Sequence, residues 1–314
     1  MKKKIILVSS IATTVLATAV SGIMLTNQLM YIKPKDPKLV YERETKALRF
    51  DEAWYNNCPK TELTVQSPNG YMIKGVFLQP LPTRNTMIIC HGVTENKLNS
   101  IKYARMFERL GFNIVVFDHR RHGETGGKTT SYGYYEKFDL QAVVQEVREM
   151  IGYDALLGIH GESMGAATTI LYAGTVEDGA DFYISDCTFS DFRVLLRRIL
   201  KQSTSLDLPV AVPFTDLFMR FRDGYSFRDV TPKEAVQYIE KPMLFVHSLP
   251  DDFIPAEMTE ELFEAKPDQK MLALFEQGDH AQSFNESPLE YEQLIKDFLF
   301  NYVDSYGYEE ETAS

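Results

Sequence analysis

The sequence predicts an α/β protein built on a mostly parallel β-sheet with helices packed on both of its faces. Along most of the chain, short apolar runs alternate with segments of helical spacing. These runs are apolar at nearly every position, which is typical of strands that are covered on both faces of a parallel sheet. One of them, Ala155–Ile159, leads through the motif Gly161–Gly165 (GESMG) into a helix-compatible segment.

Composition and charge are those of an ordinary globular protein. The 314 residues are 44% hydrophobic and 25% charged, which is enough to bury one large core with a small insertion. A net charge of −11, with no basic cluster among aromatic residues, argues against a nucleic-acid partner. Cys58, Cys90 and Cys187 have no paired spacing, so we expect neither a disulfide framework nor a zinc site. Nothing in the sequence indicates an oligomeric state.

The N-terminal segment, residues 1–32, is predicted to lie outside the folded domain. Three lysines follow Met1, and no charged residue lies between Lys4 and Lys33. This stretch is long enough to cross a bilayer as a helix, which needs about 20 residues. Residues 5–25 therefore predict a retained anchor, and a single-pass cell-membrane protein with its folded domain outside the cell. The alternative is a secretory signal cleaved near Ala17–Ala19, which would give a secreted protein.

The next two segments are a connector and a hairpin. Residues 33–60 are polar, with helical potential around Leu39–Tyr55. Thr61–Gln66 and Tyr71–Leu78 then alternate between apolar and polar residues with period two, and Ser67–Gly70 between them has turn chemistry. This pattern predicts a β-hairpin that adds antiparallel strands at one edge of the sheet.

The alternating strands and helices follow the hairpin. The predicted strands are Thr86–Cys90, Asn113–Phe117, Ala155–Ile159, Asp181–Ser185, Pro242–Val246 and Lys270–Phe275. The predicted helices between and after them are Ser100–Leu110, Phe138–Ile151, Ala166–Ala173 and Leu289–Tyr302. The folded domain is therefore expected to span residues 61–303, followed by an acidic tail at 304–314.

One long segment interrupts this alternation. It lies between Cys187 and Pro242 and contains two runs of helical character, Phe192–Leu200 and Val212–Phe221. Loops of this length without secondary structure are rare in compact domains. Residues of about 188–240 are therefore predicted to form a helical insertion that caps the site.

The motif around Ser163 has the form of a sharp turn between a strand and a helix. Such a turn strains the serine backbone and lifts its hydroxyl clear of the sheet. A hydroxyl is a weak nucleophile and needs a base to accept its proton. In this architecture the acid and then the histidine follow the serine, and only His247 and His280 come later in the chain. His280 lies in the loop after the last predicted strand, so it is the expected base.

The remaining parts of a catalytic site are predicted from the loops after neighbouring strands. The loop after Pro242–Val246 offers two acids, of which spacing favours Asp251 over Asp252 as the partner of the base. A developing oxyanion needs amide donors. The expected donors are the amide of Met164, just after the serine, and that of Val93, in the loop after the first parallel strand.

Taken together, these motifs resemble those of the α/β-hydrolase superfamily, and most closely its bacterial membrane-associated or secreted serine hydrolases of the esterase and serine-aminopeptidase-like branch. The resemblance covers nearly all of the predicted folded domain and implies about eight strands, with a cap inserted after the sixth. Two features depart from the pattern: Ser248 follows His247 where many relatives carry glycine, and Glu162 introduces a charge beside Ser163 that would alter substrate charge preference. The motifs that carry the resemblance are His91–Gly92, Asp118–Gly123, Gly161–Gly165, Asp251–Pro255 and Gly278–His280.

The sequence therefore predicts a serine hydrolase that cleaves a small carboxylic ester through an acyl-enzyme. It needs no cofactor, and no metal site is expected because His119 and His122 lack a third ligand at recognisable spacing. A peptidase or an acyltransferase would use the same Ser163, His280 and Asp251, and stays open as an alternative. A second alternative is a binding protein without catalytic activity on the same fold.

Overall fold

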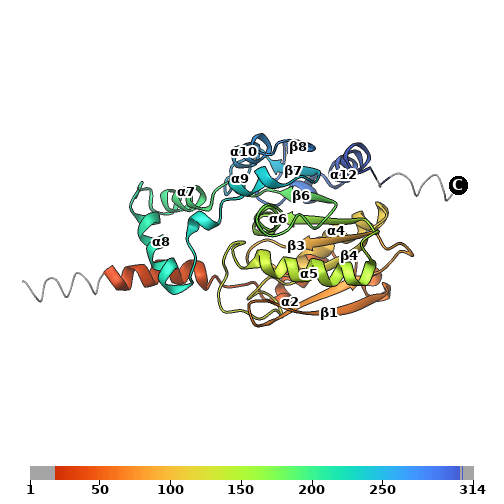
Figure 1. Ribbon diagram of the computed structural model, residues 1–314, viewed down its shortest axis with the longest axis horizontal. Coiled ribbons are helices and arrows are strands. Elements are labelled where there is room, and N and C mark those ends of the chain that lie inside the picture. Colours follow the sequence, from red (N-terminus) through yellow and green to blue (C-terminus); the bar gives the residue numbers. More distant parts are fainter. Residues whose placement is uncertain (1–17, 305, 307–314) are drawn as a thin grey trace, which may run out of the picture.

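The computed structural model describes residues 18–304 and 306 of the chain. They form one sheet of eight strands in the order β1-β2-β4-β3-β5-β6-β7-β8 (Figure 1). This confirms the predicted fold class. The strands are β1 Lys60–Gln66, β2 Met72–Leu78, β3 Thr86–Cys90, β4 Asn113–Phe117, β5 Leu157–Glu162, β6 Phe182–Asp186, β7 Met243–Ser248 and β8 Lys270–Phe275.

The sheet is antiparallel at one edge and parallel everywhere else. β1 pairs with β2 as a hairpin, and β2 pairs with β4 in antiparallel register. From β4 onward all neighbours are parallel. β3 lies between β4 and β5, so the chain leaves β3 towards one side of the sheet and later returns to its other side. Such a reversal opens a crevice at the carboxyl ends of the strands, where ligands bind in open α/β sheets.

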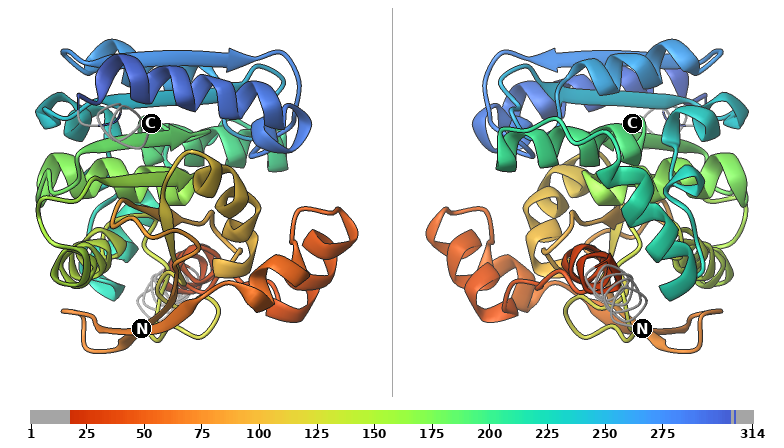
Figure 2. Two further views of the ribbon diagram at one scale, coloured as in Figure 1. Left: turned by 90° about the vertical axis from the view of Figure 1, so that its right-hand side faces the viewer. Right: turned by 90° about the vertical axis from the view of Figure 1, so that its left-hand side faces the viewer.

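Helices cover both faces of the sheet, because alternate strand residues feed two separate cores. Ile88 and Cys90 of β3 pack into the core beneath α5 and α6, whereas Met87 and Ile89 pack into the core beneath α4 and α12. Figure 2 shows the two helical layers on either side of the strands. The bounds of these helices and of α10 and α11 are α4 Lys97–Arg109, α5 Glu136–Ile151, α6 Met164–Thr175, α10 Glu257–Ala265, α11 Ser283–Glu286 and α12 Pro288–Tyr302.

The segment between β6 and β7 is helical. α7 and α8 extend beyond the end of the sheet (Figure 1), and α7 contacts the loop after β7, where Arg198 and Gln202 donate to the Asp252 carbonyl at 3.3 and 3.2 Å. Its elements are α7 Phe192–Thr204, α8 Ala211–Arg222, the 3₁₀ turn η1 Phe227–Asp229, α9 Pro232–Ala235 and the 3₁₀ turn η2 Val236–Tyr238.

The connector forms two short helices beside the sheet, α2 Pro37–Lys46 and α3 Glu52–Asn57 (Figure 2). An aspartate begins each of them: Asp36 accepts from the amide of Lys38 at 2.8 Å, and Asp51 accepts from that of Trp54 at 2.9 Å. These carboxylates satisfy amides that a first helical turn leaves without partners.

The predicted localisation, a single-pass cell-membrane protein, is wrong for the residues that the structure describes. Within residues 18–304 and 306, no helix combines the length and the apolar character that crossing a bilayer requires. Residues 5–17 of the predicted anchor, and most of the predicted signal, lie outside the described residues.

The described part of that N-terminal segment is a helix over residues 18–30 that packs against the folded domain. Arg222 of α8 donates to the Ile23 carbonyl at 3.1 Å and to the Asn27 side chain at 2.7 Å. The Leu29 carbonyl accepts from the Tyr132 hydroxyl at 3.2 Å, and Met30 is buried. On the helix, the groups that hold it to the folded domain are therefore backbone carbonyls and an uncharged side chain, which accept from Arg222 and Tyr132.

Candidate active site

Ser163 occupies the sharp turn between β5 and α6 in a strained backbone conformation, with φ +55° and ψ −115°. Its amide donates to the Asp186 carbonyl at 2.9 Å, which holds the turn against β6. Glycine is required on both sides because the backbones approach so closely. A Cβ on Gly165 would lie 2.1 Å from the Cys90 carbonyl oxygen, and one on Gly161 would lie 2.5 Å from Ala166 Cα.

The structure brings His280 to Ser163. Ser163 Oγ lies 2.8 Å from His280 Nε2, across 117 positions of sequence. The loop after β8 carries the histidine, and the ring of Phe253 packs edge-on against its imidazole, with centroids 5.0 Å apart. Ser163 is buried, whereas the His280 side chain keeps 21% of its surface exposed. The imidazole can therefore reach both the hydroxyl and an incoming molecule.

Asp251 lies on the other side of the imidazole. Its Oδ2 is 2.7 Å from His280 Nδ1, and its Oδ1 accepts from the amides of Phe253 and Ile254 at 2.9 and 2.8 Å. The carboxylate accepts the Nδ1 proton, so the Nε2 lone pair faces the Ser163 hydroxyl. Asp252, the alternative acid, is exposed, and its side chain makes no hydrogen bond to His280 within the described chain.

A second histidine, which sequence reasoning set aside, also contacts Asp251. Nε2 of His247 lies 3.1 Å from Asp251 Oδ2 and 2.8 Å from the Ile254 carbonyl, so it is a donor, while Nδ1 lies 2.6 Å from the Thr259 hydroxyl. Burial alone would raise the pKa of Asp251, but the hydrogen bonds from His247 and His280 hold that pKa well below its usual range. The four-residue spacing of His247 and Asp251 at a strand end was the available signal.

The two predicted oxyanion donors flank Ser163. Val93 follows Gly92, which lies against Ser163. A Cβ built on Gly92 would be 3.5 Å from Ser163 Cβ. Met164 begins α6, where first-turn amides have no partner in the helix. Among the described residues, neither of these two amides donates to a protein group.

A cluster of buried histidines supports the loop that carries Val93. His122 Nε2 accepts from the Thr94 amide at 3.1 Å, and His91 Nε2 accepts from the His119 amide at 3.0 Å. Burial lowers the pKa of His91 and His119, and it lowers that of His122 to about 4. Neutral rings keep these nitrogens free to accept. No group of three or more His, Cys, Asp or Glu side chains in the described chain is arranged to hold a metal ion.

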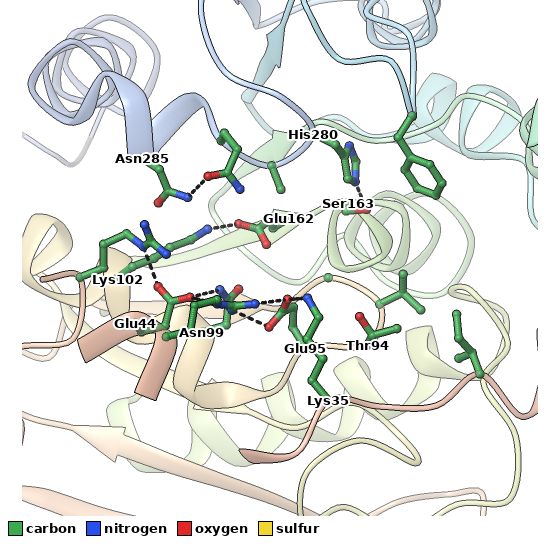
Figure 3. Close-up of a pocket in the computed structure, with 18 residues that line it drawn as sticks. Lys35, Glu44, Thr94, Glu95, Asn99, Lys102, Glu162, Ser163, His280 and Asn285 are labelled. Atoms are coloured by element: carbon green, nitrogen blue, oxygen red, sulfur yellow. Dashed lines mark hydrogen bonds and ion pairs between the residues drawn. The ribbon is translucent and has the colours of Figure 1, made fainter. Parts of the chain in front are cut away.

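A pocket of about 510 Å³ opens onto Ser163 and His280. Its far wall comes from the connector, with Lys35, Arg43, Glu44 and Arg49, and no described residue of the 188–240 insertion lines it. Sequence reasoning treated the connector as a spacer and missed these residues. Figure 3 shows Ser163 facing His280, with Glu162 beside Ser163 and Lys102 reaching towards Glu162, and with Lys35, Glu44 and Glu95 farther across the pocket.

The charge of Glu162, the unusual residue of the motif, is balanced inside the protein. Its carboxylate is paired with Lys102 at 2.5 Å and accepts from the Tyr103 hydroxyl at 2.8 Å. The Lys102 and Glu162 side chains are only 2% and 4% exposed. Glu162 therefore does not present an uncompensated negative charge beside Ser163.

Comparisons with known proteins agree with this architecture. A family model described as the alpha/beta hydrolase fold matches residues 85–207. The chain is 43% identical to the uncharacterized protein YqkD of Bacillus subtilis, over 97% of this chain and 99% of that protein.

Two solved structures share the fold at low sequence identity. The Pyrococcus furiosus esterase Pf2001 is 20% identical, with a TM-score of 0.65 over 81% of this chain and 95% of that one. An acylaminoacyl peptidase of Pyrococcus horikoshii is 17% identical, with a TM-score of 0.59 over 81% of this chain and 44% of that one.

Proposed function

The chain belongs to the α/β-hydrolase superfamily and is a hydrolase, and we propose that it is a serine hydrolase that cleaves carboxylic esters. One observation carries the proposal. Ser163 Oγ, His280 and Asp251 form a continuous hydrogen-bonded series, with contacts of 2.8 and 2.7 Å. Such a series can move a proton from the hydroxyl to the imidazole while the carboxylate stabilises the resulting imidazolium.

The proposed reaction has two halves. Ser163 Oγ attacks the carbonyl carbon as its proton passes to His280 Nε2, and the oxyanion accepts from the amides of Val93 and Met164. The imidazolium then returns the proton to the departing alkoxide, which leaves an acyl-enzyme. A water molecule, deprotonated by His280, attacks the acyl carbon, and Ser163 is regenerated as the carboxylic acid departs.

The pocket supports a small-molecule substrate, because about 510 Å³ is within the range that encloses one small ligand. A peptidase stays as the second candidate, favoured by the likeness to the acylaminoacyl peptidase fold. The two differ in the leaving group, which is an alkoxide from an ester and an amine from a peptide. Parallel assays of an ester and the matched amide distinguish them.

A fluorophosphonate probe tests the nucleophile. We expect the wild-type protein to be labelled and Ser163→Ala to be unlabelled. Ser100→Ala is the matched control, because Ser100 is also a buried serine and its hydroxyl has no partner in the described structure. This variant should label like the wild type. If the wild-type protein is not labelled at all, the serine hydrolase proposal is wrong, and a binding protein on the hydrolase fold becomes the remaining candidate.

A further inference from the structure

The pocket at Ser163 is lined by both apolar and charged residues. Near His280 the lining includes three apolar residues: Phe253, whose ring packs against the imidazole, Ala281, which follows His280 in the chain, and Val93. Charged side chains line the rest of the pocket. Glu162 and its partner Lys102 lie beside Ser163, and the charged residues farther from it are Lys35, Arg43, Glu44, Arg49 and Glu95.

These seven residues are four cations and three carboxylates, which leaves one positive charge in excess. Glu44 and Glu95 are ionised. Burial alone would raise the pKa of Glu44 and of Glu95, but hydrogen bonds from the neighbouring cations hold both pKa values below their usual range. Arg43 and Lys35 supply those bonds to Glu95, and Arg43 and Arg49 supply them to Glu44.

Each oxygen of the Glu44 and Glu95 carboxylates already accepts a hydrogen bond from a neighbouring arginine. Glu44 accepts from Arg43 Nε and from Arg49 Nε, each at 2.7 Å, with one oxygen for each. Glu95 accepts from Arg43 Nη1 and Nη2 at 3.0 and 2.8 Å, again with both oxygens. These groups therefore have little capacity left to bind a cationic or donor-rich ligand.

Donors, in contrast, are left over. Arg49 uses only Nε, and neither of its Nη groups has a partner among the described residues. Its side chain is 26% exposed and lines the pocket. Asn99, with its amide turned so that both ends are satisfied, donates to Glu162 at 3.3 Å and accepts from Arg43 at 3.2 Å. The donors that can still bind a ligand here are therefore the two Nη groups of Arg49. A planar guanidinium with two parallel donors is the group that best matches a carboxylate.

We propose that the substrate carries a carboxylate on the arm that enters the connector side of the pocket, and that Arg49 binds it. The inference rests on the proposed function, because it concerns the molecule whose ester bond Ser163 attacks. A single carboxylate balances the single excess positive charge. An alkyl chain here would instead desolvate seven charged groups without replacing their contacts with water, which is unfavourable.

Matched esters test the charge preference on each side of the scissile bond. On the acyl side, the mono-para-nitrophenyl ester of adipic acid is compared with its terminal carboxamide. On the alcohol side, para-acetoxybenzoate is compared with para-acetoxybenzamide. We expect kcat/KM to be about tenfold or more higher for the carboxylate in one of these pairs, as a charge-assisted contact supplies. The preference should shrink as salt is added.

Variants of Arg49 assign that preference to one residue. Arg49→Gln should lower kcat/KM more on the carboxylate ester than on its neutral partner, so that the ratio of the two falls to about one, and Arg49→Lys should keep part of the preference. Arg84→Gln is the control, because Arg84 is an exposed arginine that pairs with Asp154 and does not line the pocket. It should keep the full preference.

The outcomes separate the two proposals. If the probe labels Ser163 but neither carboxylate is preferred over its neutral partner, the inference is wrong and the serine hydrolase stands. A preference that survives in Arg49→Gln also overturns the assignment. If no ester is cleaved and the probe does not react, both proposals fail together.

Discussion

Asp251 receives a hydrogen bond from His247 through the same oxygen, Oδ2, that contacts His280, with 3.1 Å to Nε2 of His247. The other oxygen is filled by the amides of Phe253 and Ile254. Four donors therefore converge on one buried carboxylate. This leaves a single orientation for Asp251, and that orientation points its Oδ2 at Nδ1 of the proposed base.

We predict that His247 is a positioning residue. His247→Leu should lower kcat about 10- to 100-fold, since it removes one charge-assisted hydrogen bond from Asp251, while KM changes little. His247→Gln should recover most of the loss, because its side-chain amide can place a donor near the position of Nε2. The labelling rate with the fluorophosphonate probe should fall in the same proportion. Equal losses in the two variants would point to packing alone.

The two neighbouring acids should differ sharply in effect. Asp251→Asn should reduce kcat about 10⁴-fold, because an amide can present its N–H to Nδ1 and favour the wrong tautomer of His280. Asp252→Asn is the matched control and should stay within about threefold of the wild type, since the Asp252 side chain is exposed. Steady-state kinetics on one ester decides the assignment. A reversed order of the two effects would make Asp252 the acid.

Local patterns were sufficient for the fold because each parallel strand is an apolar run in its own right, and the two hairpin strands show period-two alternation on either side of a turn sequence. They failed at strand ends. The run Ala155–Ile159 stops before His160, yet β5 continues through Glu162, because these polar side chains find buried partners: His160 meets Tyr291 and Glu162 meets Lys102. Such partners come from distant segments, and one sequence without an alignment does not reveal them.

The same reasoning explains what was missed around Ser163. Chain order indicated Ser163, His280 and Asp251, because the superfamily resemblance fixes which loops meet. Arg49 and the rest of the connector showed only polarity and helical spacing, which do not say what they face. The prediction of a membrane anchor failed for a related reason. The N-terminal segment lacks charged residues, but the Asn27 side chain and the Ile23 carbonyl accept hydrogen bonds from Arg222, and hydropathy does not reveal such contacts.

Lys102 and Glu162 form a buried ion pair beside Ser163, and removal of either partner should lower the free energy of unfolding. Lys102→Met should destabilise the protein by about 3–5 kcal/mol, because it leaves the Glu162 carboxylate buried without its cation. The double variant Lys102→Met/Glu162→Gln should regain most of that loss. Arg109→Met is the control, as Arg109 pairs with Glu292 at the surface and should contribute less than about 1 kcal/mol. Urea unfolding midpoints measure all three, and a Lys102→Met variant as stable as Arg109→Met would contradict the prediction.

Acid should destabilise the fold partly through His160. This ring is fully buried, its Nε2 lies 2.9 Å from the Tyr291 hydroxyl, and its Nδ1 has no partner in the described structure. Burial, with a smaller effect of Lys102, lowers the pKa of His160 from 6.5 to about 3. Between these two values the unfolded chain binds a proton that the folded chain does not. As the pH is lowered through that window, the free energy of unfolding should therefore decrease, by up to about 1.4 kcal/mol per pH unit from this group.

A comparison with His160→Phe isolates that contribution. Asp139 and Asp186 oppose it, because burial raises the pKa of each to about 6, so below pH 6 the folded protein binds their protons first. Both carboxyls are present in both proteins, and the effect of Asp139 cancels in the difference. Asp186 accepts from the same Tyr291 hydroxyl that contacts His160, so the comparison is repeated in an Asp186→Asn background. Urea unfolding of the two proteins at a series of pH values should give a shallower acid loss for His160→Phe. Parallel curves would show that His160 takes up its proton equally in the folded and unfolded chains, and would exclude it as a source of acid sensitivity.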